Sequence, residues 1–166
     1  ISSSFDFVFD KLTFKAQTSV SNEAPALAST TDPLVRDIYE VGLNTLKECM
    51  QTVYEDGPKR DRRLWIGDLY LEALANAYTF KNHELTKYCL YLLAAFANDE
   101  GLLHATLLEK PQPHPQYGTH TLGYCLIYNV ALLEYLKETG DMETANDLWP
   151  VAVRQIELAL RQFSSE

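Results

Sequence analysis

The chain has 166 residues, enough for one domain that buries its own apolar core. It carries 14 Lys and Arg against 23 Asp and Glu, a formal net charge of −9, so it lacks the basic face that phosphate recognition requires. We therefore expect neither nucleic acid nor an anionic membrane among its partners.

The N-terminal residues predict a short β segment. Apolar and polar residues alternate over 5–15, the pattern of a strand with one buried face. No later stretch offers this strand a clear partner, and residues 17–30 form a polar linker rich in Ser and Thr. We therefore expect residues 1–20 to be a strand remnant of a preceding β domain, and residues 21–166 to form a helical domain.

The rest of the chain predicts five helices. Asp32-Pro33 is a strong start for the first, because Asp caps free N–H groups and Pro fits the first turn. Gly140 is a good C-terminal cap for the fourth helix, and Pro150 marks a point of irregularity in the fifth. From the apolar periodicity, the expected helices cover about 33–53, 67–78, 84–97, 119–139 and 141–163.

Short turns alternate with long connections between these helices. The turns at 80–84 and 138–141 are short, whereas the connections at 54–68 and 98–120 are long, and the second includes an extended piece at 102–108. Loops of this length in compact domains are usually functional or mobile. The alternation favours an all-α fold of antiparallel helix pairs, an α/α toroid whose long connections gather on one face and carry the site.

The three cysteines do not form a recognisable framework. Cys49, Cys89 and Cys125 each lie inside an apolar helical pattern, without the short spacing of a disulfide scaffold or a zinc site. We expect buried free thiols. No signal-peptide pattern and no apolar run of the ~20 residues needed for a membrane span is visible.

The connection at 54–68, YEDGPKRDRRLWIGD, is the richest in chemistry. It holds four carboxylates and four cations, with Gly-Pro near one end and Trp and Gly-Asp at the other. One interpretation is a salt-bridged connector between two helices, although surface ion pairs contribute only ~0–1 kcal/mol each. The other interpretation is part of an active site.

The segment DGPKRDRRLWIGD resembles the signature of the bacterial α-L-rhamnosidases, glycoside hydrolase family 78. That signature is roughly Asp-Cys-Pro-x-Arg-Asp-Glu-Arg-x-Gly-Trp-x-Gly-Asp. The stretches TDPLVRDIYEVGLNTLKECMQTVYEDGP and THTLGYCLIYNVALLEYLKETGDMETANDLWPVAVRQIELAL are similar to the family's helix before the signature and to a later helix pair. Together the resemblance covers about residues 30–163.

The resemblance implies an (α/α)6 barrel that hydrolyses terminal α-L-rhamnose with inversion. Five helices would be about half of that barrel, the N-terminal half of the catalytic domain, and the family's general base, a Glu, would lie further downstream than this chain. The location implied is the bacterial cytoplasm or periplasm, and the implied partners are a carbohydrate substrate and the remainder of the parent polypeptide. Self-association is the other way to cover an open half-toroid.

The signature is matched residue by residue, with departures. Gly57 stands in place of Cys, and one residue is missing between Arg63 and Trp65. Arg62 stands where the family has its general-acid Glu, which puts the acid role in doubt. The positions that match a carboxylate, an arginine or the tryptophan of the signature are Asp56, Arg60, Asp61, Arg63, Trp65 and Asp68.

The catalytic candidates are Asp61 and Asp56. Inverting hydrolysis needs a protonated carboxyl and a second carboxylate ~6.5–9.5 Å away. The arginines on both sides count against Asp61 as the acid, because nearby positive charge favours an ionised carboxylate, whereas Asp56 or Asp68 would act in the opposite direction. For Asp56 and Asp68 the alternative role is to accept hydrogen bonds from sugar hydroxyls.

The substrate-binding candidates are Arg60, Arg62, Trp65, Asp68 and His120. Trp65 offers a flat face to a sugar ring, or else packs in the core. Asp68 sits at a helix start, where capping of free N–H groups is an equal alternative. His120 begins the fourth helix near the expected site, and the histidines of this loop lack the spacing of a metal site.

The expected function is therefore a glycosidase that needs no cofactor and no metal. Two alternatives stay open. The same fold could act on another sugar, an acidic one included, with Arg62 recognising a carboxylate. The chain could instead be a helical module that binds carbohydrate or protein without catalysis.

Overall fold

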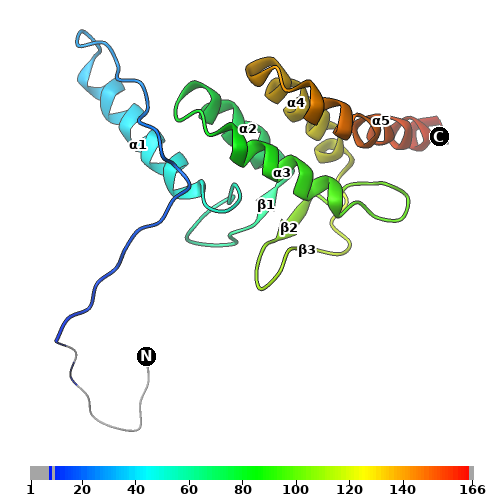
Figure 1. The fold of residues 1–166 in the computed structure, drawn as a ribbon, viewed down its shortest axis with the longest axis horizontal. Coiled ribbons are helices and arrows are strands. Elements are labelled where there is room, and N and C mark those ends of the chain that lie inside the picture. The colour runs from blue at the N-terminus through cyan, green and yellow to red at the C-terminus, as the bar shows by residue number, and fades with distance from the viewer. Residues whose placement is uncertain (1–7, 9, 165–166) are drawn as a thin grey trace.

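The computed structural model describes residue 8 and residues 10–164. In this part of the chain there are five helices and one three-stranded sheet. Figure 1 shows α2 and α3 at the centre, α4 and α5 beside them, and α1 on the opposite flank. The helices are α1 Pro33–Cys49, α2 Ile66–Tyr78, α3 His83–Ala95, α4 Leu122–Thr139 and α5 Met142–Ser164.

The predicted start of α1 and end of α4 are confirmed, and capping residues fix both. Asp32 caps α1 by accepting a hydrogen bond from the Leu34 N–H at 2.8 Å. Gly140 ends α4 in the left-handed conformation, with φ of 69°, which glycine adopts without a steric penalty. Pro150 lies inside α5, which continues past it as one helix.

The first helix ends earlier than the expected position 53. After Cys49 the chain turns back on itself in an isolated bridge between Met50 and Tyr54. Met50, Val53 and Tyr54 are then almost fully buried among the helices. These apolar residues therefore continue the hydrophobic pattern of α1 in the sequence but belong to the core beneath the following connection.

A small antiparallel sheet joins the two long connections. Its strands are β1 Leu64–Trp65, β2 Thr106–Leu108 and β3 His114–Pro115, in the order β1-β2-β3. Leu64 pairs with Leu107, and Leu107 pairs with Pro115. The extended piece expected at 102–108 contains β2, whereas β3 was not expected. In Figure 1 the three strands lie on one side of the helices, so the two connections form one surface.

The predicted N-terminal strand has no counterpart in the described residues. Residues 1–7 and 9, including Phe5, Phe7 and Phe9, lie outside them. Val8 and residues 10–15 adopt no regular secondary structure, and Val8 and Phe14 are about nine-tenths exposed, at 91% and 90%. The prediction is wrong for this described part, because β2 pairs with β1 and β3 and no described strand pairs with residues 10–15.

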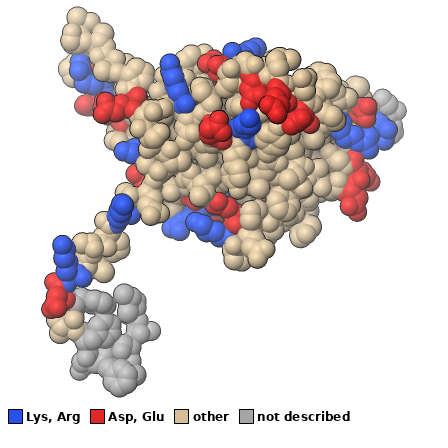
Figure 2. Space-filling model, viewed as in Figure 1, with Lys and Arg blue, Asp and Glu red and all other residues tan. Residues whose placement is uncertain are grey.

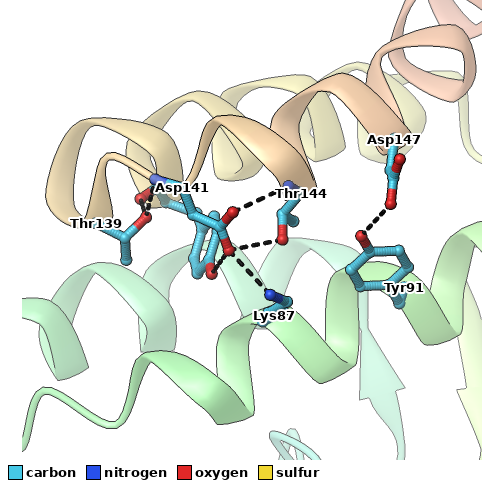
Figure 3. A network of polar contacts seen from close by, with 7 residues as sticks. Lys87, Tyr91, Thr139, Asp141, Thr144 and Asp147 are labelled. Atoms are coloured by element: carbon cyan, nitrogen blue, oxygen red, sulfur yellow. Dashed lines mark hydrogen bonds and ion pairs between the residues drawn. The ribbon is translucent and has the colours of Figure 1, made fainter.

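A polar network holds the turn between α4 and α5 against α3 (Figure 3). Asp141 accepts hydrogen bonds from the Tyr135 hydroxyl and from the backbone and hydroxyl of Thr144, and it forms an ion pair with Lys87 at 3.0 Å. Hydrogen bonds from Thr144 are the main cause that lowers the pKa of Asp141. One carboxylate thus caps α5 and joins it to α3 and α4.

The described helices expose apolar residues on both flanks. Four large apolar side chains of α1 are more than half exposed, as are Trp149 and Leu160 on α5. An apolar groove of about 110 Å³ between α4 and α5 is lined by Leu133, Trp149 and Ile156, among others. No described helix is long and apolar enough to cross a membrane. The four exposed residues of α1 are Leu34, Val35, Ile38 and Val41.

Candidate active site

The connection at 54–68 is closed by its own backbone. The Asp56 N–H donates to the Arg63 carbonyl at 3.0 Å, and the Arg63 N–H donates to Asp56 Oδ1 at 2.9 Å. Inside this closed loop Arg62 has φ of 54°, a conformation that side chains rarely adopt, and its Nε donates to the Pro58 carbonyl at 2.7 Å. Asp56 therefore closes the loop with both its backbone and its carboxylate.

The loop leads directly into β1 and α2. The Ile66 N–H donates to the Ala105 carbonyl at 3.0 Å, which joins the start of α2 to the connection at 96–121. Trp65 meets Tyr124 of α4 edge to face, with ring centroids 6.1 Å apart. At Gly67 an added Cβ would lie 2.8 Å from the Tyr124 ring, so any larger residue would require this ring to shift. The aromatic pair therefore lies where α2 and α4 begin.

Three carboxyl groups of the loop and the start of α2 are partly or largely buried. Burial, followed by the charge of Asp56, raises the pKa of Asp68, which lies in the first turn of α2. Glu55 is only 7% exposed, and its burial raises its pKa against the opposing charges of Lys110 and Arg62. One turn after Asp68, the carboxyl of Glu72 has a pKa raised to about 8, chiefly by burial. Burial costs a charged carboxylate its hydration, so these groups retain protons more readily.

Asp61 lies on the outer part of the loop. Its side chain is 39% exposed and forms an ion pair with the exposed Arg60 at 3.7 Å. It lines an open groove of about 610 Å³ together with Glu55, Arg62 and Lys110, among others. The structure thus places two of the predicted site residues, Asp61 and Arg62, in one groove, while Asp56, Trp65 and Asp68 lie along the loop and the start of α2.

His120 lies apart from that groove. Its ring is 4.4 Å from the buried ring of His104, and its Nδ1 is 3.2 Å from the Leu103 carbonyl oxygen. It lines another cavity, of about 460 Å³, with Leu122 and Arg161. Among the described residues no group of three or more His, Cys, Asp or Glu side chains could hold a metal ion.

The second long connection is held in place by a buried amide. The Gln155 side chain of α5 accepts from the Leu103 N–H at 3.1 Å and donates to the Gly101 carbonyl at 2.8 Å. Gln155 is fully buried. In the same loop, Asn98 Oδ1 accepts hydrogen bonds from the Glu100 and Leu102 N–H groups. These bonds position β2, which in turn supports β1 and the start of α2.

The structure adds residues that the sequence did not single out. Glu55 and Tyr124 lie in the stretches that resemble the family, but the sequence assigns neither of them a role. The spacing of four between Asp68 and Glu72 places both on one face of α2 and was a usable signal. No signal in the sequence links Gln155 to a loop more than fifty residues earlier.

Charges of both signs share the surface that Figure 2 shows. Lys and Arg groups lie between Asp and Glu groups, and tan atoms cover most of the face. The sequence as a whole carries a formal net charge of −9.

Residues 24–163 match the model of the bacterial alpha-L-rhamnosidase 6 hairpin glycosidase domain. The chain belongs to this family. Its five helices in antiparallel pairs confirm the predicted all-α class and the partial toroid. Among curated proteins, none matches the chain closely enough to show a relationship.

Two solved structures support the assignment. A rhamnosidase from Klebsiella oxytoca with rhamnose bound is 47% identical, has a TM-score of 0.82, and is matched over 87% of this chain and 28% of its own. A GH78 family rhamnosidase of Bacillus sp. GL1 is 25% identical, with a TM-score of 0.75 over 86% of this chain and 14% of its own. This chain therefore spans less than a third of either rhamnosidase.

Proposed function

We propose that this chain is part of an inverting glycoside hydrolase that releases terminal α-L-rhamnose. The observation that carries the proposal is the 47% identity to a rhamnosidase with rhamnose bound, over 87% of the chain. Its substrate would be a rhamnose-bearing glycoside, oligosaccharide or polysaccharide. The remainder of the polypeptide would supply the general base.

In this proposal the closed loop and the start of α2 bind the sugar. Asp56 and Asp68 are carboxylates that can accept hydrogen bonds from hydroxyl groups, and Trp65 with Tyr124 gives an apolar surface for the ring and its methyl group. Arg60 and Arg62 would contact the sugar or the leaving group at the rim. His120 stays a proposed substrate contact, although it lines a separate cavity.

Asp61 is our proposed general acid, with Asp56 as the second catalytic carboxyl. Asp61 lies in the open groove beside the buried Glu55, and Arg62 donates to the backbone of its own loop through Nε. In the Michaelis complex a leaving group that fills this groove would bring the glycosidic oxygen beside the Asp61 carboxyl. A proton would then pass from Asp61 to the glycosidic oxygen.

A panel of chromogenic glycosides tests the proposal on the full-length protein. We expect turnover of the α-L-rhamnoside, and loss of turnover in Asp61→Asn and in Asp56→Asn while folding persists. Asp37→Asn, at an exposed position of α1, is the matched control. NMR of the first product anomer should show β-L-rhamnose, the result of inversion.

Other outcomes favour the other functions. Turnover of an acidic sugar alone would replace rhamnose as the substrate. Sugar affinity by calorimetry without turnover of any glycoside would identify a binding module in which Arg62 replaces a lost acid.

A further inference from the structure

Glu72 belongs to a group of carboxylates, and no cation of the described residues is paired with it. Asp68 is one turn earlier on the same face of α2, and the charges of Asp68, Asp56 and Glu55 all act on the Glu72 carboxyl. In the described part of the chain, the ion pairs are Arg60–Asp61, Lys87–Asp141, Lys137–Glu134 and Arg154–Glu157, and none includes a member of this cluster.

Within the described residues, the Glu72 carboxyl has one hydrogen-bond donor, a thiol, which offsets its burial only in part. The buried Cys49 thiol, at the end of α1, is its hydrogen-bond donor, and Oε2 is buried without a hydrogen-bond partner. From the other side, the charge of Glu72 acts on the buried Tyr54 and on the buried Cys89 of α3, both of which are neutral groups. An ionised carboxylate with one unpartnered buried oxygen and three carboxylate neighbours is costly.

We propose that Glu72 is a positioning residue of the sugar site that acts through Asp68 and Asp56 by keeping its own proton at neutral pH. A neutral Glu72 leaves Asp68 and Asp56 free to accept hydrogen bonds from sugar hydroxyls. Loss of the Glu72 proton adds a charge one turn behind Asp68 and drives the three carboxylates apart. This inference rests on the proposed sugar site, and it assigns a residue that the signature of the family does not include.

The pH dependence of kcat/KM for an α-L-rhamnoside tests this role in the full-length protein. Burial raises the pKa of Glu72 to about 8, so we expect kcat/KM to fall about tenfold per pH unit above that value. Glu72→Gln carries a neutral side chain at every pH, so its kcat/KM should not show this fall at high pH, the alkaline limb of the profile. Glu72→Ala, which leaves a gap, should lower kcat/KM roughly tenfold at all pH values without a limb of its own.

Two further variants separate this effect from a structural one. Cys49→Ala removes the thiol that stabilises the ionised carboxyl, so the limb should move to higher pH. Glu143→Gln, an exposed carboxyl in the first turn of α5, should keep the wild-type profile. An alkaline limb that persists unchanged in Glu72→Gln overturns the proposal.

A titration that does not depend on activity distinguishes the two proposals. The ¹³C carboxyl signal of Glu72, assigned by its loss in Glu72→Gln, should titrate well above the ordinary Glu value of 4.5. If it does so in a protein that turns over no rhamnoside, the proposed function fails and the assignment of the proton to Glu72 stands. If the signal titrates near 4.5, the inference is wrong whatever the activity.

Discussion

The buried amide of Gln155 gives the sharpest test of how the site is supported. Gln155→Leu keeps the side-chain volume but removes the acceptor of the Leu103 N–H and the donor to the Gly101 carbonyl. The Val151 carbonyl, which also accepts from Gln155, keeps its helical hydrogen bond. The variant therefore leaves two backbone groups of the site-supporting loop without their partners.

The expected cost follows from those two groups. Each buried group left unpaired costs about 1–3 kcal/mol, which gives about 2–6 kcal/mol. Burial of the leucine returns about 1.5–3 kcal/mol. We expect a net loss of about 2 kcal/mol in the free energy of unfolding, or a fall in Tm of about 4–8 °C for a domain of this size.

Denaturation in urea, followed by far-UV circular dichroism, measures this loss. Gln112→Leu, on the exposed part of the same long connection, is the matched control and should change stability by less than about 0.5 kcal/mol. If Gln155→Leu is as stable as the control, water or a relaxed loop satisfies the two groups, and the amide is not what holds the connection.

Three further predictions concern the frame of the site. Tyr54→Phe removes a buried hydroxyl pair with Thr86 at 2.9 Å, and should lower the free energy of unfolding by about 1–2 kcal/mol in urea titrations. The pKa of Asp141 is lowered in the folded state, so its contribution to stability is present above the unfolded value and is lost as pH falls below it. Asp141→Asn should thus unfold more readily at pH 7, with a difference that shrinks toward pH 2 in thermal melts. Gly67→Ala should displace Tyr124, change the near-UV circular dichroism of the aromatic pair and weaken rhamnose affinity measured by calorimetry, with little loss of helix content.

Local chemistry explains which parts of the fold were predictable. Asp32 and Gly140 fix helix ends by their own capping geometry, so both ends are visible in the sequence. The end of α1 is not, because Met50 and Tyr54 keep an apolar pattern while the backbone turns into the core. The strand β3 has only two residues, one of them Pro115, and it exists because β2 lies beside it.

Some site residues could likewise be predicted from the sequence, and others could not. The signature residues from Asp56 to Asp68 are contiguous, so their pattern is visible before the fold is known. The burial of Glu55 and Glu72 and the bonds of Gln155 arise from packing between elements distant in the sequence, and no local pattern encodes them. The stacking of His120 on His104 is likewise a tertiary contact.

The central claim is that this chain carries the acid half of a rhamnosidase site. The most direct measurement is kcat/KM of the full-length protein and its Asp61→Asn variant on an α-L-rhamnoside with a poor, sugar leaving group, which requires protonation. We predict turnover by the wild type and a loss of about 10²–10⁴-fold in Asp61→Asn, the usual contribution of general-acid catalysis. A nitrophenyl leaving group needs less protonation, so Asp61→Asn should lose less kcat/KM on a nitrophenyl rhamnoside. An equal loss of kcat/KM on both substrates, or no loss on either, would contradict the role of Asp61. Absence of turnover in a folded wild type would contradict the proposed rhamnosidase activity.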